Sequence, residues 1–70
     1  MITLHAVIEY LNANDCEMRY KLFKGVRSIV LLKRYQKVSF VINPDDLLMD
    51  WAEFKRGILQ PQMDYLNRML

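Results

Sequence analysis

The sequence predicts one small α+β domain over residues 1–70: an N-terminal helix or strand, a three-stranded antiparallel meander and two C-terminal helices. Three observations predict this fold class. Apolar and polar residues alternate through the middle of the chain, which is typical of half-buried strands. Apolar residues recur at helical spacing towards both ends, and the segment NPDD at 43–46 is typical of a helix start. A small sheet hides one apolar face, so we expect the helices to pack together on that face.

Residues 3–13 fit a helix and also fit a strand. The hydroxyl of Thr3 can cap a helix, and the apolar residues that follow recur at helical spacing: Leu4, Val7, Ile8 and Leu11. The alternation from Ile2 to Tyr10 also fits a first strand, which would give the sheet four strands. We favour the helix, and the polar run NAND at 12–15 ends the element in either case.

Three strands are expected in residues 16–22, 26–34 and 37–42. The first and third alternate between apolar and polar residues, and the second is short and rich in β-branched residues, although a helix also remains open there. Gly25 supplies the positive φ that a tight hairpin turn needs. The second turn, expected near Tyr35 and Gln36, lacks the usual glycine, asparagine or aspartate.

The clearest local signal in the chain is the helix start at NPDD. Asn43 can cap the helix, Pro44 fits its first position, and the two aspartates that follow face the positive end of the helix dipole. We therefore expect a helix over about 44–56, interrupted by Gly57 and Pro61, with Pro61 opening a second short helix. Trp51 shares a side of the first of these helices with other apolar residues, so we expect it to be buried against the sheet: Leu47, Leu48 and Phe54.

Cysteine content and hydropathy indicate where the protein is located. Cys16 is the one cysteine, so no intramolecular disulfide can form, which favours a reducing compartment and a cytoplasmic protein. The longest apolar run, 29–32, is far too short to span a membrane, and the N-terminus lacks the features of a signal peptide. We expect a chain that is neither secreted nor membrane-bound.

Few residues are suited to catalysis or metal binding. His5 and Cys16 could form a nucleophile and base, but no local motif supports them. The carboxylates of Asp45, Asp46 and Asp50 could hold a metal, yet helix capping accounts for them. Neither glycine lies in a phosphate-binding loop. We therefore expect no enzymatic activity, no metal and no cofactor.

Charge is segregated along the chain. Residues 19–43 carry seven Lys or Arg and no Asp or Glu, whereas the segments before and after carry net charges of −3 and −2. We interpret the basic segment as a partner-binding surface, in which Ile29, Leu31 and Tyr35 are exposed beside Lys33 and Arg34 as an apolar patch with a polar rim. The candidate binding residues are Arg19, Lys21, Lys24, Arg27, Lys33, Arg34, Tyr35 and Lys37.

An acidic protein surface is the partner that we favour. The chain would then be a regulator or inhibitor, a role that small chains of this style often have, including those carried by viruses. The alternative is that the basic residues bind no partner and only protect the sheet from aggregation.

Nucleic acid is the second candidate partner. The cations are interleaved with aromatic residues that could stack on bases: Tyr20, Phe23, Tyr35 and Phe40. The predicted order of elements is also similar to that of double-stranded-RNA-binding domains. Those domains place a basic cluster at the start of the final helix, where this chain has Pro44, Asp45 and Asp46, and these carboxylates would repel phosphates.

The last ten residues are expected to join an apolar interface, most simply in a homodimer, because so short a helix is not stable alone in water. The alternative is that they dock within the chain beside Ile58 and Leu59. The candidate self-association residues are Met63, Tyr65, Leu66, Met69 and Leu70.

Overall fold

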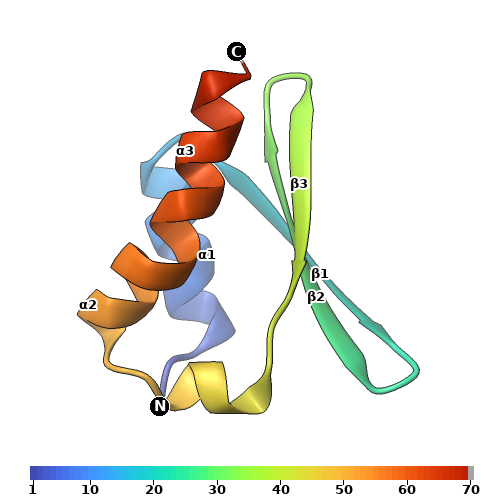
Figure 1. Ribbon diagram of the computed structural model, residues 1–70, viewed down its shortest axis with the longest axis vertical. Coiled ribbons are helices and arrows are strands. Elements are labelled where there is room, and N and C mark those ends of the chain that lie inside the picture. Colours follow the sequence, from blue (N-terminus) through green and yellow to red (C-terminus); the bar gives the residue numbers. More distant parts are fainter. Residues whose placement is uncertain (70) are drawn as a thin grey trace.

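The computed structural model of the protein, which describes residues 1–69, shows the expected α+β fold (Figure 1). A helix leads into a three-stranded sheet, and most of the described residues after the sheet are helical. The elements are α1 (Leu4–Ala13), β1 (Glu17–Phe23), β2 (Val26–Lys33), β3 (Gln36–Val41), a 3-10 turn (Pro44–Leu48), α2 (Trp51–Phe54), a π turn (Lys55–Leu59) and α3 (Gln60–Arg68). None of the helices in these residues has the length and apolar character needed to cross a membrane.

The first element is the helix that we favoured over a strand. The hydroxyl oxygen of Thr3 accepts a hydrogen bond from the Ala6 amide at 3.1 Å and so caps α1. The helix ends where Asp15 adopts a φ of 56° and the Cys16 amide donates to the Leu11 carbonyl at 2.9 Å. This left-handed residue after the helix is a common way to satisfy its last carbonyls.

The sheet is an antiparallel meander in the order β1-β2-β3, with β2 in the centre. Two-residue turns join the strands. Lys24 and Gly25 form the first turn, both with positive φ, as expected for Gly25. The second turn consists of Arg34 and Tyr35, so it lies one residue earlier than predicted, and Arg34 takes the left-handed conformation with a φ of 55°.

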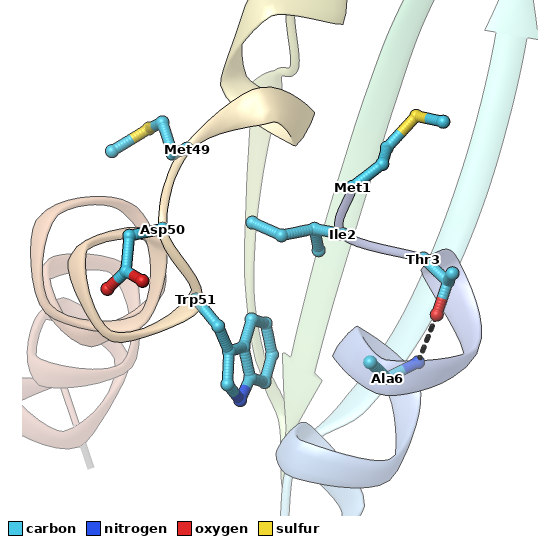
Figure 2. A pocket seen from close by; sticks show the side chains of 7 residues that line it. All are labelled: Met1, Ile2, Thr3, Ala6, Met49, Asp50 and Trp51. Atoms are coloured by element: carbon cyan, nitrogen blue, oxygen red, sulfur yellow. Dashed lines mark hydrogen bonds between the residues drawn. The ribbon is translucent and has the colours of Figure 1, made fainter.

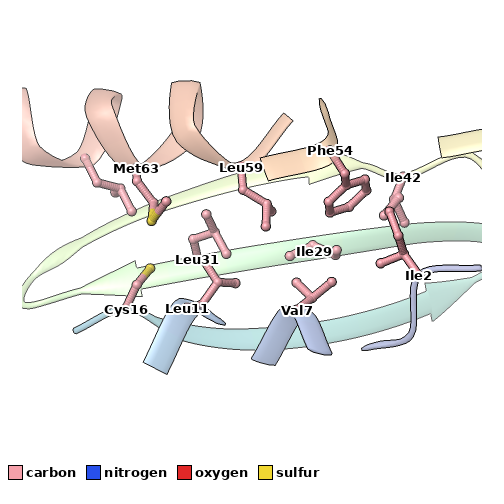
Figure 3. Close-up of a cluster of buried hydrophobic side chains, with 11 residues drawn as sticks. Ile2, Val7, Leu11, Cys16, Ile29, Leu31, Ile42, Phe54, Leu59 and Met63 are labelled. Carbon is pink, nitrogen blue, oxygen red and sulfur yellow. The ribbon is translucent and has the colours of Figure 1, made fainter. Parts of the chain in front are cut away.

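The core lies between the sheet and the helices, which cover one face (Figures 1 and 3). Ile29 and Leu31 on β2 are fully buried there, with α1 packed along β1 and α3 over β2 and β3. The expectation that these two residues are exposed beside the cations is wrong. The register pairs Ile29 with Phe40 and Leu31 with Val38, so all four side chains point towards the helices.

The break between the C-terminal helices is not where the sequence suggested. The segment from Pro44 forms only a 3-10 turn, whose Asp46 carboxylate accepts from the Asn43 amide at 2.9 Å. The chain then extends at Met49, and Asp50 caps a new helix by accepting from the Ala52 amide at 3.2 Å. The predicted helix over 44–56 is therefore wrong, because the Asp50 cap starts a helix within it.

Gly57 and Pro61 do not interrupt the helix that follows. Helical structure runs without a gap from Trp51 to Arg68, with a π turn over 55–59. A helical proline clashes with the carbonyl four residues earlier, here that of Gly57. The π turn lies over this carbonyl and accommodates the irregularity, so the chain passes Pro61 without ending the helix.

Trp51 is half-buried and lies between helices, which corrects the prediction that it is buried against the sheet. Its ring meets Tyr10 of α1 edge-on, with 5.8 Å between ring centroids, and stacks on Phe54 at 6.0 Å. Phe54, which is fully buried near Ile42, takes the place expected for Trp51 (Figure 3). Leu48, expected on the same side, is exposed because the 3-10 turn is separate from α2.

We predict that Arg34→Gly is more stable than Arg34→Ala by about 0.5–1 kcal/mol, measured by urea denaturation. Both variants lose the same exposed side chain, but only glycine adopts a positive φ without a steric cost. Equal midpoints for the two variants would show that the turn holds no such strain.

We also predict that Phe54→Ala costs roughly 3–5 kcal/mol of unfolding free energy, whereas Trp51→Ala costs about 2 kcal/mol. The difference follows from the full burial of Phe54 and the partial burial of Trp51. The native Trp51 emission maximum should lie between those of buried and fully exposed tryptophan. A larger loss for Trp51→Ala than for Phe54→Ala would contradict this packing.

Candidate binding surface

One face of the sheet is covered by no helix in residues 1–69, and we call it the open face (Figure 1). Strand register decides which residues it carries, because directly paired residues point to the same side. Arg19 pairs with Val30, and Val30 with Ser39, so these three share the face opposite Ile29. The full set is Glu17, Arg19, Lys21, Phe23, Val26, Ser28, Val30, Leu32, Lys37, Ser39 and Val41.

The open face is positively charged. Its cations are Arg19, Lys21 and Lys37, and its one acidic residue is Glu17. The Arg19 Nε lies 3.7 Å from a Glu17 carboxylate oxygen, but both side chains are largely exposed, so this pair contributes little to stability. A cationic surface with little internal compensation is suited to an anionic partner.

The hairpin end, residues 22–27, is an exposed apolar feature beside these cations. The third strand ends at Val41, opposite Ser28, so β1 and β2 continue beyond it as a two-stranded ribbon that projects from the body (Figure 1). Leu22, Phe23 and Val26 are therefore 61%, 71% and 48% exposed. Phe23 and Val26 lie on the open face and Leu22 lies on the opposite face of the ribbon, so the hairpin end exposes apolar side chains on both sides. No other element of the described chain covers them.

Cations lie next to these apolar side chains on both faces of the hairpin end. Lys24 lies in the turn, and its Nζ is 5.4 Å from the centroid of the Phe23 ring. Arg27 pairs directly with Leu22, and Lys21 precedes it on β1. The hairpin end thus combines large apolar side chains with a basic rim, which is typical of an interaction site.

The eight predicted binding residues do not form one surface. Lys24 and Arg27 lie at the hairpin end, whereas Arg34 and Tyr35 form the turn at the opposite end of the sheet (Figure 1). Lys33 lies on the helix-covered side, where its Nζ donates to the Asn67 side chain of α3 at 2.9 Å. The structure gathers the other three, Arg19, Lys21 and Lys37, on the open face.

Sequence reasoning missed the exposed side chains of the hairpin end. Leu22 was expected to be half-buried because it alternates with charged residues, like Met18 in the same strand. Met18 contacts the core, but Leu22 lies beyond it. A signal was available, since a third strand shorter than the second leaves the far end of the first hairpin without a neighbour.

The predicted self-association residues are divided between the core and the surface. Met63 and Leu66 are buried in the chain's own core, as the intramolecular alternative expects. Tyr65 and Met69 are exposed, and Leu70 lies outside the described residues. A homodimer through this segment stays a prediction. Among the described candidate residues, only Tyr65 on α3 and Met69 just after it are exposed.

The candidate catalytic and metal-binding residues are not brought together. His5 is exposed and pairs with Glu9 at 2.8 Å, while Cys16 lies buried past the other end of α1, roughly 15 Å along the helix axis. Asp46 and Asp50 accept backbone hydrogen bonds as helix caps. In residues 1–69, no three His, Cys, Asp or Glu side chains cluster as metal ligands.

Two shallow hollows lie on the helical side. One, of about 360 Å³, opens beside the N-terminus and Trp51, and its polar side chains include Thr3 and Asp50 (Figure 2). Both of these already accept hydrogen bonds from helix amides. The other, of about 320 Å³, lies between Tyr10 and Gln60. Neither hollow gathers side chains that indicate a particular ligand.

Comparison with protein-family models, curated proteins and solved structures found no match to this chain. The open face and the hairpin end are therefore the features from which a function can be inferred.

We predict that Cys16 reacts slowly with a thiol reagent in the native protein and quickly in urea. Burial raises the pKa of the Cys16 thiol, and the positive charge of Lys33 and a backbone hydrogen bond from Leu32 only partly oppose this effect. The thiol is thus both shielded and largely protonated at neutral pH. Equal reaction rates with and without urea would contradict the burial of Cys16.

Proposed function

We propose that this protein is a non-enzymatic binding module, a regulator or inhibitor that docks its open face and hairpin end on an acidic surface of a partner protein. The observation that carries the proposal is the exposure of Leu22, Phe23 and Val26 beside Lys21 and Lys24.

Burial of the exposed apolar side chains would provide the favourable free energy of binding. Large apolar side chains that are exposed on a protruding element favour aggregation and add nothing to the core. Such patches mark interaction sites. Burying a side chain such as Phe23 contributes about 1.5–3 kcal/mol before the costs of association. The hairpin end could thus serve as the anchor, with Phe23 at its centre.

The cations supply the specificity. No Asp or Glu occurs between Glu17 and Asp45, so the whole sheet presents positive charge apart from its first residue. Charge complementarity of this kind speeds association with an acidic surface and disfavours basic ones. The acidic residues gather instead in the helical segments, which would orient the module with its sheet towards the partner.

The sheet supplies pre-organisation. The strands are paired without interruption over their printed registers, and tight turns close both hairpins. A surface that is already ordered loses little conformational entropy on binding, so more of the contact energy appears as affinity.

Nucleic acid is a weaker alternative on this geometry. Of the four aromatic residues proposed to stack on bases, only Phe23 lies on the open face. Tyr20 and Phe40 point towards the helix side, and Tyr35 lies in the turn at the far end. α2 is capped by Asp50 and carries Glu53 in its first turn, and these carboxylates would repel phosphates.

The same proposal includes a cytoplasmic location and no need for a cofactor. The free, buried thiol of Cys16 suits a reducing compartment. Binding through exposed side chains also requires no nucleophile or base, so we expect His5→Ala to retain full partner binding.

We predict that the double variant Arg19→Glu, Lys21→Glu abolishes partner binding while changing stability by less than about 1 kcal/mol, because both side chains are exposed. The matched control is Arg56→Glu, Arg68→Glu, which reverses two exposed charges in the helical segments. The measurement is affinity capture from cytosolic extract, treated or untreated with nuclease, followed by binding of the purified partner and urea denaturation of each variant.

A protein partner that survives nuclease, is lost in the sheet variant and is retained by the control would support the proposal. Loss of every partner after nuclease, together with a steep fall in affinity with salt, would favour nucleic acid instead. Equal binding by both double variants would contradict a role for the open face.

A further inference from the structure

The free edge of β3 presents unpaired backbone groups of known identity. Lys33 and Gln36 flank a two-residue turn, so they form a hydrogen-bonded pair, and at the other end of the strand the Ile42 amide donates to the Arg27 carbonyl at 2.9 Å. Even-numbered residues of β3 therefore bond to β2. The amides and carbonyls of the intervening residues point away from the sheet: Lys37, Ser39 and Val41.

This edge has few of the features that normally prevent strand pairing. It contains no proline, and its register with β2 has no bulge. Lys37 is its one charged residue. On the helix side, Val38 and Phe40 touch the core but remain half-buried, which leaves apolar surface beside the edge.

The other free edge, on β1, carries three charged residues, Glu17, Arg19 and Lys21, where β3 carries one. The same reasoning from the first turn gives it outward backbone groups at Met18, Tyr20 and Leu22. A second copy paired antiparallel about Tyr20 would place Arg19 opposite the partner subunit's Lys21, and this clash would occur twice. Like charges directly opposite destabilise a pair of strands, so β1 disfavours this pairing.

We propose that β3 pairs with β3 of a second copy of this chain, antiparallel about a twofold axis at Ser39, to form a continuous six-stranded sheet. In this register Lys37 lies opposite the partner subunit's Val41, so no like charges meet directly. On the helix side, Val38 lies opposite the partner subunit's Phe40, and each covers apolar surface that the other leaves exposed. Such an interface is isologous and closed.

The pairing differs from the dimer expected through residues 61–70, where Met63 and Leu66 are already buried. The pairing would also bring together the open faces and hairpin ends of two copies. A twofold axis perpendicular to the sheet keeps both open faces on the same side, so two basic faces and two hairpin ends would act together. Their combined avidity for a partner with repeated acidic sites would exceed that of one copy.

The test compares Val41→Lys with Val41→Glu. Val41 is 56% exposed, so both variants should fold, and both lose the same methyl groups. Lysine would face the partner subunit's Lys37 twice, and glutamate would form two opposite-charge pairs instead. We expect the wild type to be a dimer by light scattering, Val41→Lys to weaken it by about tenfold or more, and Val41→Glu to strengthen it.

Far-ultraviolet circular dichroism and urea midpoints verify that both variants fold, and a Tyr65→Asp variant on α3 serves as a matched surface control. Arg19→Glu, Lys21→Glu should leave the dimer intact, which separates this inference from the proposed partner site. A wild-type monomer up to millimolar concentration would overturn the inference. So would equal dissociation by both Val41 variants, or a dimer that only Tyr65→Asp dissociates.

Discussion

The burial of Ile29 and Leu31 on the central strand is the constraint on which the rest of the structure depends. Both are fully enclosed between the sheet and the helices, and no other strand has neighbours on both sides. Side chains alternate along a strand, so enclosing these two sends Val30 to the opposite face. Register then carries Arg19 and Ser39 to that face as well. The position of the basic surface is thus a consequence of how the core is filled.

Two features of the fold leave apolar side chains uncovered. The helices in residues 1–69 cover one sheet face, and the main cluster of buried side chains lies on that side. On the open face, Val30 of the central strand is buried at 9% exposure. β3 ends opposite Ser28, so the first hairpin extends past both the core and its neighbouring strand. Leu22, Phe23 and Val26 are therefore exposed.

Charged residues of opposite sign have different roles in this fold. Asp46 and Asp50 accept hydrogen bonds from backbone amides at the starts of helical segments, so part of the acidity of the helical region serves local structure. Among the cations, Lys33 links the sheet to α3 by donating a hydrogen bond to the Asn67 side chain. Arg19 and Lys21 make no contact of that kind with another element in the described chain, and this is why we propose a partner-binding role for them.

Sequence alone determined the features that depend on near neighbours along the chain. Capping by Thr3, alternation through the strands and the turn at Gly25 correctly predicted the first helix, the meander and the α+β class, and alternation placed Arg19 and Lys21 on one face. Only the tertiary structure decided which alternating residues are buried, because that depends on the central strand and on how far each element overlaps the next. It placed the helix break at Asp50, buried Leu66 in the core and exposed the hairpin end, since burial is set by elements that are distant in sequence.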